Sequence, residues 1–273
     1  MKKQKLAVVF AALLTMVGFS SCLKDDGISQ SVGYFEVNSE LGSVTFSDVL
    51  GLKLVPNQVI TTSSNSKLAY IYYQYNDADY TADTKNLPIT LLENPVFLTD
   101  LGSISSMLPD ENETVSLYSL GDGGVWGYNK YLILAPAIYL KKGTTIENLS
   151  TELANHRLNL YYLPDEDDEN SNTLKLYLRY EIAGVGDSAA EEADDKESWA
   201  SDYTIQYSRL SYVNLQPIIS MYKSTHGGKE PEKVIVEYEY NNSNNSTSSV
   251  PTIAKKQTET VTYTLYKDTS SSN

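Results

Sequence analysis

Residues 174–182 are Leu-Lys-Leu-Tyr-Leu-Arg-Tyr-Glu-Ile, and apolar side chains alternate with more polar ones from Leu174 to Ile182. A period of two places successive side chains on opposite faces of a strand, so one face is expected in a core and the other in solvent. Residues 233–240, Lys-Val-Ile-Val-Glu-Tyr-Glu-Tyr, repeat the pattern. The two stretches predict an antiparallel sheet with one solvated side.

Strand-length segments without helical periodicity extend outward from these two stretches. Before a polar stretch at 102–124, which we interpret as a boundary, they are Ser31–Val37, Ser43–Phe46, Leu50–Val55, Lys67–Tyr75 and Leu87–Leu98. After it they are Trp126–Tyr139, Asn155–Leu163, Asp202–Leu215, Ile218–Lys223 and Thr260–Tyr266. Residues 145–154 favour one short helix. The chain is therefore predicted to be all-β, with a small barrel at 31–101, an antiparallel β-sandwich at 102–267 and a polar tail at 268–273.

The first 21 residues are predicted to be a signal peptide. Three lysines precede the apolar run Leu6–Gly18, and Ser20 and Ser21 stand before Cys22. An apolar run of this length is too short for a transmembrane helix, which needs about 20 residues. Residues 22–30 are then a lipidated tether.

The residues Phe19-Ser-Ser-Cys22 resemble a bacterial lipobox. The resemblance implies that Cys22 is acylated, with palmitate among its chains, and anchors the protein to a membrane. Lys24, Asp25 and Asp26 resemble the charged tag that exports some lipoproteins to the cell surface. The expected location is the outer membrane, with the protein facing the cell exterior.

The composition excludes several classes of function. Loss of residues 1–21 removes three lysines and no acidic residue, so the net charge changes from −14 to −17. Such a surface repels nucleic acid, and the membrane is expected as a partner only through the anchor at Cys22. A single cysteine provides neither a disulfide framework nor a second thiol.

Several segments of the predicted sheets resemble the NigD-like lipoprotein family. They are Cys22-Leu-Lys-Asp-Asp-Gly27, Gly33-Tyr-Phe-Glu-Val37, Leu68–Tyr75, Trp126-Gly-Tyr-Asn-Lys-Tyr131-Leu-Ile-Leu134, Leu174–Tyr180, Tyr203-Thr-Ile-Gln-Tyr207 and Val234–Tyr240. The resemblance implies an N-terminal OB-type barrel and a C-terminal β-sandwich. It implies no catalytic residues, because the family has no established activity.

No pattern of catalytic or metal-binding residues stands out. His156 and His226 lack neighbouring ligands at metal-binding spacing, and the sequence contains no Gly-x-Ser-x-Gly elbow. The acidic stretch 165–172 departs from the EF-hand pattern, and we interpret it as a hydrated loop. A pair of catalytic carboxylates, as in a glycosidase, remains an alternative, because the chain holds 35 acidic residues. We expect no enzyme, no metal and no cofactor.

Aromatic residues are the candidate ligand contacts. Tyr70, Tyr72, Tyr73 and Tyr75 could build a sugar platform with Trp126 and Trp199, although alternation splits the four tyrosines between two faces. Tyr161 and Tyr162 are neighbours in a predicted strand, so one of the two is expected to point outward. Ser188, in Asp187-Ser-Ala189, resembles an O-glycosylation acceptor.

These observations favour a surface-exposed outer-membrane lipoprotein with a non-catalytic binding or assembly role toward an unknown protein or glycan. The alternatives are a carbohydrate-binding accessory protein of a surface glycan system and a hydrolase. An exposed coplanar strip of aromatic rings would favour the first alternative. A buried carboxylate pair or a His–acid pair in a pocket would favour the second.

Overall fold

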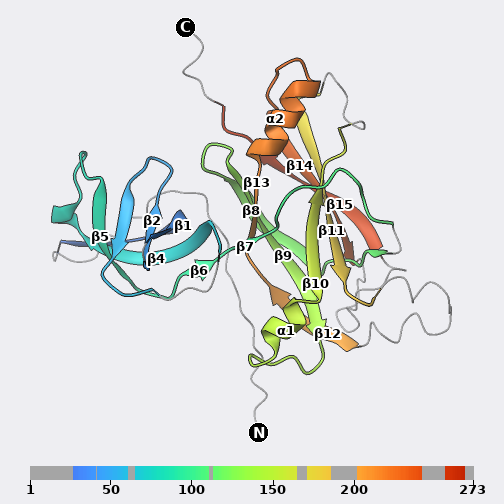
Figure 1. Cartoon of the computed structure of the whole chain (residues 1–273), viewed down its shortest axis with the longest axis horizontal. Helices are drawn as coiled ribbons and strands as arrows, with labels where there is room; N and C mark the ends of the chain where they lie inside the picture. The colour runs from blue at the N-terminus through green and yellow to red at the C-terminus, as the bar shows by residue number, and fades with distance from the viewer. Residues whose placement is uncertain are drawn as a thin grey trace. The chain divides into compact units, whose positions relative to one another are not determined.

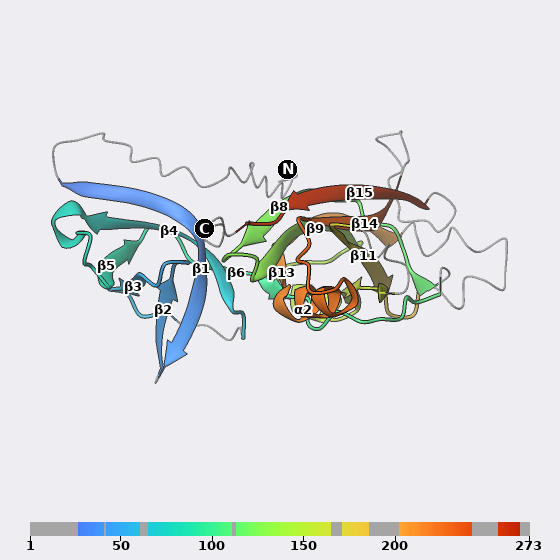
Figure 2. The same cartoon turned by 90° about the horizontal axis from the view of Figure 1, so that it is seen from above.

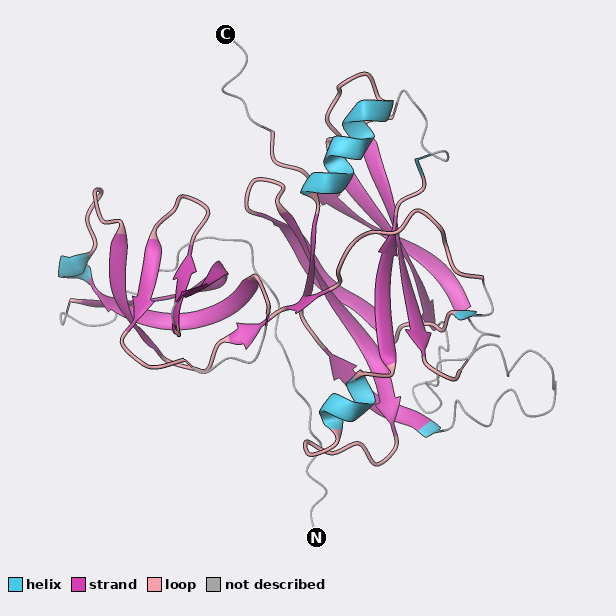
Figure 3. Ribbon diagram, in the orientation of Figure 1, coloured by secondary structure: helices cyan, strands magenta, loops and turns pink. Residues whose placement is uncertain are grey.

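The computed structural model describes residues 27–40, 42–60, 65–110, 113–164, 171–185, 202–241 and 256–267. The chain forms two compact units that divide between Asp100 and Leu101, with the short segment Trp126–Tyr128 grouped with the first unit (Figure 1). Strands make up nearly all of the regular structure (Figure 3). Among the described residues no helix is long and apolar enough to cross a bilayer.

The first unit is a closed five-stranded barrel. Its strands are β1 (Ile28–Glu40), β2 (Ser43–Ser47), β3 (Lys53–Pro56), β4 (Leu68–Asn76) and β5 (Asn86–Leu91), with β6 (Val96–Phe97) beside β4. The strand order is β1-β2-β3-β5-β4, and β4 pairs with β1 to close the ring (Figure 1). Only β3 and β5 are parallel. The prediction of a small OB-type barrel is confirmed.

The long strand β1 closes the ring because it pairs with a strand on each side, β4 and β2. It pairs antiparallel with β4 from Ile28↔Asn76 to Glu36↔Leu68, and its last residues, from Glu36 onward, also pair with β2. Alternate residues of the strands point inward, as the period of two requires, and fill the centre. The most deeply buried of them are Phe46, Leu54, Ala69, Ile71, Leu87 and Ile89.

The second unit contains two sheets around one core. The four-stranded sheet has the order β10 (His156–Tyr161), β11 (Thr173–Ile182), β14 (Lys233–Asn241) and β15 (Lys256–Thr264). The other has the order β12 (Tyr203–Ser208), β9 (Tyr131–Lys141), β13 (Ser211–Asn214) and β7 (Thr99–Asp100), and β8 (Ser119–Trp126) pairs with β9. Apolar side chains from both sheets form one cluster, as expected for a sandwich. Figure 2 shows β14 and β15 side by side in one layer of this unit.

Two elements of the second unit differ from the prediction. The central pair β11–β14 is parallel, from Thr173↔Lys233 to Leu178↔Tyr238, so the sandwich is not wholly antiparallel. The segment Ile218–Lys223, predicted as a strand, belongs to helix α2 (Gln216–Thr225). Its buried side chains follow the helical spacing i, i+3, i+4 and i+7, at Leu215, Ile218, Ile219 and Tyr222. The other helix, α1 (Leu149–Leu153), lies inside the stretch predicted to be helical.

Part of the polar face of β11, at Tyr177 and Arg179, is buried rather than solvated. Arg179 is 8% exposed, because it lies between two glutamates of β14 and contacts Glu237 at 2.8 Å and Glu239 at 3.5 Å. Lys256 of β15 approaches Glu239 to 3.2 Å and donates to the hydroxyl of Thr114 at 2.8 Å. Pairing of this kind makes the burial of charges tolerable.

Part of the polar stretch 102–124 covers this cluster instead of acting only as a boundary. Val115 donates its N–H to the carbonyl of Tyr180, and Leu117 donates to that of Glu239, both at 2.8 Å. Residues 114–117 are therefore buried between the ends of β11 and β14.

A close approach of β8 to β9 depends on Gly123. A Cβ atom at this position would lie 2.3 Å from the carbonyl oxygen of Ile133, which is backbone and cannot rotate away. At the adjacent Gly124 a Cβ atom would meet nothing within 4 Å.

We predict that Gly123→Ala lowers the free energy of unfolding of the second unit by about 1–3 kcal/mol or more, because the methyl group must push the two strands apart. Gly124→Ala is the matched control, with an expected change within roughly 0.5 kcal/mol. Urea unfolding of both variants, followed by far-UV circular dichroism, measures the difference. Equal stabilities of the two variants would show that β8 and β9 do not approach so closely.

Candidate functional site

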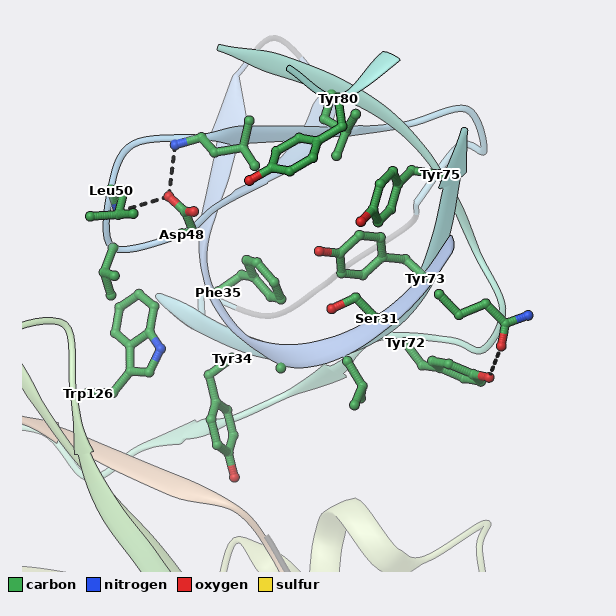
Figure 4. A pocket seen from close by; sticks show the side chains of 16 residues that line it. Ser31, Tyr34, Phe35, Asp48, Leu50, Tyr72, Tyr73, Tyr75, Tyr80 and Trp126 are labelled. Atoms are coloured by element: carbon green, nitrogen blue, oxygen red, sulfur yellow. Dashed lines mark hydrogen bonds between the residues drawn. The ribbon is translucent and has the colours of Figure 1, made fainter. Parts of the chain in front are cut away.

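The barrel holds a pocket of about 550 Å³, which we call the barrel pocket (Figure 4). Its walls come from the first half of β1, the β2–β3 connection, the second half of β4 and the β4–β5 connection. Its volume is in the range of small-molecule sites, roughly 300–1,000 Å³. Of the regions that OB-type barrels commonly use for ligands, it includes the connection between strands 4 and 5, through Tyr80, but not the face of strands 2 and 3.

Four aromatic rings form a continuous series along the pocket. Phe35 packs edge-to-face on Tyr73 at 5.7 Å between centroids, Tyr73 contacts Tyr75 at 6.1 Å, and Tyr75 packs edge-to-face on Tyr80 at 5.7 Å. Phe35 and Tyr73 belong to the barrel core, whereas Tyr80 is 53% exposed. The series therefore leads from the core to solvent.

The strand register explains why these rings share one side. Ser31 of β1 lies opposite Tyr73 of β4, and Ser29 lies opposite Tyr75, so the side chains of each pair lie on the same face of the sheet. Tyr80 follows the 3₁₀ turn Asp77–Asp79, where its N–H donates to the carbonyl of Asp77.

Asp48 is the single acidic residue of the barrel pocket. Its Oδ1 accepts the N–H groups of Leu50 at 2.9 Å and Leu52 at 2.8 Å, as expected for an aspartate that begins a tight turn. Gly51 completes this turn with φ +89°, a conformation that favours glycine. The turn fixes the carboxylate at the pocket wall.

Hydroxyl groups converge beside this carboxylate. Figure 4 shows Tyr73, Tyr75 and Tyr80 with their hydroxyl ends directed toward the space next to Asp48. Burial raises the pKa of Tyr73, a hydrogen bond with Ser31 lowers it, and the charge of Asp48 raises it further. Tyr73 therefore keeps its proton at physiological pH, and a phenol hydroxyl can both donate and accept hydrogen bonds.

The tyrosines predicted as a sugar platform divide as alternation requires. Tyr73 and Tyr75 enter the pocket, whereas Tyr72 donates its hydroxyl to Gln30 and Tyr70 packs against Tyr34. Trp126 also lines the pocket and is 5% exposed. The rings are inclined by 35° to 80° to one another, so they do not form a coplanar strip.

The prediction that either Tyr161 or Tyr162 points outward is wrong, because both side chains are buried. Tyr161 is 6% exposed and Tyr162 is 1% exposed. Strand β10 ends at Tyr161, and the segment at Ser105 crosses there: Tyr162 donates its N–H to the carbonyl of Ser105 at 2.9 Å. The alternation therefore stops at the point where the prediction relied on it.

Other candidate residues lie outside the part of the chain that the structure describes: Cys22, Lys24, Asp25, Asp26, Ser188 and Trp199. Their roles stay predictions.

The histidines have structural surroundings. His156 is 4% exposed; Nδ1 lies 2.5 Å from the hydroxyl of Tyr180, and Nε2 lies 3.0 Å from Oε1 of Glu152. His226 stacks on Tyr222 at 3.7 Å between ring centroids. Neither histidine lines the barrel pocket. Among the described residues no group of three or more His, Cys, Asp or Glu side chains could hold a metal ion.

Comparison with known proteins supports the fold. No family model and no curated protein match the chain. A candidate lipoprotein from Bacteroides fragilis is 21% identical, and the match covers 88% of this chain and 99% of that one with a TM-score of 0.64. The chain shares its fold.

Two further solved structures are more distant. A protein of unknown function from Bacteroides vulgatus is 12% identical over 89% of this chain and 93% of its own, with a TM-score of 0.50. A NigD-like immunity protein from Bacteroides caccae is 13% identical over 81% and 89%, with a TM-score of 0.42. A NigD-like protein is thus among the structural neighbours of the chain. The predicted all-β fold is confirmed by the strands of the structure and by the likeness to the Bacteroides fragilis protein.

The buried His156 is expected to make the stability of the second unit depend on pH. Burial lowers the pKa of His156, and the hydrogen bond with Glu152 only partly opposes this effect. Tyr203 and Tyr180 pack on the ring, and nearby Arg209 also disfavours its protonation. The unfolded chain, with an ordinary histidine, therefore binds the proton more tightly than the folded chain does.

We predict that stability falls as the pH drops below about 6.5, the ordinary pKa of histidine, toward the lower folded value. His156→Gln, which cannot titrate, should show a smaller loss between pH 7.5 and pH 5.5. Thermal unfolding at both pH values measures this. An unchanged pH dependence in the variant would exclude His156 as its source.

Proposed function

We propose that this protein is a lipid-anchored outer-membrane protein, facing the cell exterior, that binds its partner in the barrel pocket and catalyses no reaction. One observation carries the proposal: the pocket brings four aromatic rings and converging hydroxyls together around a single carboxylate. This is the composition of a recognition site. The partner is a protein or a glycan, and the acidic chain disfavours nucleic acid.

The pocket lacks the paired groups that common hydrolytic mechanisms need. General acid–base catalysis uses two titratable groups with different roles, and a nucleophile needs a base within hydrogen-bond reach. Among the described residues that line the pocket, Asp48 is the single carboxylate, and there is no histidine and no second acid beside it. The pair His156–Glu152, at 3.0 Å, is buried in the other unit away from this pocket, so it supports a structural role rather than a hydrolase.

The proposed anchor would keep the pocket close to the membrane. Strand β1 begins at Ile28, six residues after Cys22, and a fully extended segment of this length spans at most roughly 20 Å. Residues 30–35 of the same strand line the pocket. A ligand of the pocket would therefore be held near the cell surface.

We predict that Cys22→Ala prevents acylation, so the protein leaves the membrane fraction or accumulates as the unprocessed precursor. Immunoblots of fractionated cells measure both outcomes. A variant that is fully processed and still membrane-bound would contradict the lipid anchor.

The same cells test the orientation. Protease added outside intact cells should cleave the wild-type protein, and replacement of Lys24, Asp25 and Asp26 by alanine should protect it by retaining it inside. Equal cleavage of the wild-type protein and the alanine variant would contradict the role of these three residues as a surface-export tag.

Recognition at the barrel pocket is tested by a photoreactive phenylalanine analogue placed at position 80. On intact cells we predict a crosslinked adduct from position 80 and none from position 266, because only Tyr80 borders the pocket. Tyr266 is the matched control, since both tyrosines are 53% exposed. Equal adducts from both positions, or none from position 80, would contradict binding there.

A further inference from the structure

We propose that the ligand of the barrel pocket is a neutral saccharide, one of whose rings is held between the aromatic series and Asp48. This inference rests on the proposed function, because it names the chemical class of the ligand for the same pocket. It is carried by the polar groups that the pocket leaves without partners, by the arrangement of the rings and by the charge.

The pocket offers both hydrogen-bond acceptors and donors to a ligand. Oδ1 of Asp48 is used by the turn, but among the described residues no donor contacts Oδ2. The hydroxyls of Tyr75 and Tyr80 likewise have no partner within the described chain, and they point to the same space (Figure 4). A ligand that donates to a carboxylate and exchanges hydrogen bonds with two phenols must itself carry several hydrogen-bonding groups, as a polyhydroxylated ligand does.

The aromatic series supplies the complementary apolar surface. Tyr80 is half exposed at the rim, and Phe35 and Tyr73 form the inner wall. The rings do not form the coplanar strip that would favour an extended glycan platform, but a single sugar ring needs only one open aromatic face. Its C–H face can pack on that ring while the hydroxyls around its edge meet the polar tips of the others.

The negative charge of Asp48 and of the whole chain disfavours anionic ligands, and the carboxylate of Asp48 also disfavours purely apolar ones. Asp48 and the net charge of −17 that remains after loss of residues 1–21 repel phosphates, carboxylates and single-stranded nucleic acid. An acyl chain or sterol would cover the Asp48 carboxylate without giving it a hydrogen bond, which is costly.

The ring geometry disfavours an organic cation. A cation is held by several aromatic faces directed at it. Here Phe35–Tyr73 and Tyr75–Tyr80 are packed edge-to-face, at 80° and 67°, so the rings of each pair do not turn their faces toward one common point as a cation cage requires.

Barrel closure disfavours an extended peptide. Peptides commonly add to a sheet by pairing with a free strand edge. The two strands that line the pocket are paired with each other over nine residues, from Ile28↔Asn76 to Glu36↔Leu68, and leave no edge between them.

The experiment uses the full mature chain without its lipid. A panel of neutral oligosaccharides of two to four units is screened, and the best binder is measured by calorimetry. Trimethylammonium compounds, uronic-acid oligosaccharides and tyrosine-rich peptides are measured in parallel. Asp48→Asn keeps an oxygen for the turn but removes the charge, and we expect it to weaken saccharide binding about tenfold or more. Tyr80→Phe removes one hydroxyl and should weaken binding about three- to tenfold.

Tyr266→Phe, equal to Tyr80 in exposure and in the other unit, should leave saccharide affinity unchanged. Thermal unfolding confirms that all three variants fold. The inference is overturned if no neutral saccharide binds, or if Asp48→Asn and Tyr80→Phe bind as the wild type does. Tighter binding of a cation or peptide that depends on Asp48 and Tyr80 would also overturn it, but would leave the proposed binding role intact. A crosslinked adduct at position 80 in the absence of saccharide binding would likewise support the binding role of the pocket and contradict the saccharide as its ligand.

Discussion

The pairing of β1 with β4 is the constraint on which the barrel and its pocket depend. It closes the five-stranded ring through nine consecutive residue pairs, and it places Ser31 opposite Tyr73 and Ser29 opposite Tyr75. A slip of one residue would turn every side chain of one strand to the other face. Tyr73 would then leave the core, and Tyr70 and Tyr72 would take the inward positions. The register, more than any single contact, therefore determines which tyrosines can meet a ligand.

In the second unit, many tyrosines are buried, and several of their hydroxyl groups are paired inside the protein. Tyr222 donates to the carbonyl of Ser171 at 2.5 Å, and Tyr238 donates to the carboxylate of Glu259 at 2.8 Å. Tyr180 bridges to His156 across the pair β10–β11. Burying a tyrosine removes a large apolar surface from water, provided that the hydroxyl finds a partner. The 22 tyrosines of the chain thus serve different purposes, and Tyr73, Tyr75 and Tyr80 direct their hydroxyls toward the space beside Asp48.

The sequence predicts those features that depend on local patterns. Alternation from Leu174 to Ile182 identified β11 and its buried face, and the split of the four barrel tyrosines followed from the same rule. Helix α2 was missed because a short apolar run fits both periods, although the spacing 215, 218, 219 and 222 carried the helical signal. Burial of Arg179 could not be foreseen, since it requires a parallel neighbour that supplies glutamates.

About half of the residues discussed for the barrel pocket were among the candidates that the sequence suggested. Tyr73 and Tyr75 belonged to the proposed platform, but Asp48 and Tyr80 lie in turns and join them only through barrel closure. Their signals were the turn sequences Asp48-Val-Leu-Gly51 and Asn76-Asp-Ala-Asp79, which fix side chains beside strand ends. Turn chemistry indicates that a residue is held in place, whereas long-range pairing determines what it faces.

The parallel pair β11–β14 has a consequence for the order in which the chain folds. Parallel neighbours need a long crossover, and here Thr173 pairs with Lys233 across 60 positions of sequence. The second unit also waits for β15, which ends at Thr264. All five barrel strands lie between Ile28 and Leu91, so their contacts are available as soon as that part of the chain has emerged from the ribosome. Because non-local contacts must first overcome loop-closure entropy, we expect the sandwich to be the slower unit and the N-terminal barrel to acquire its shape first.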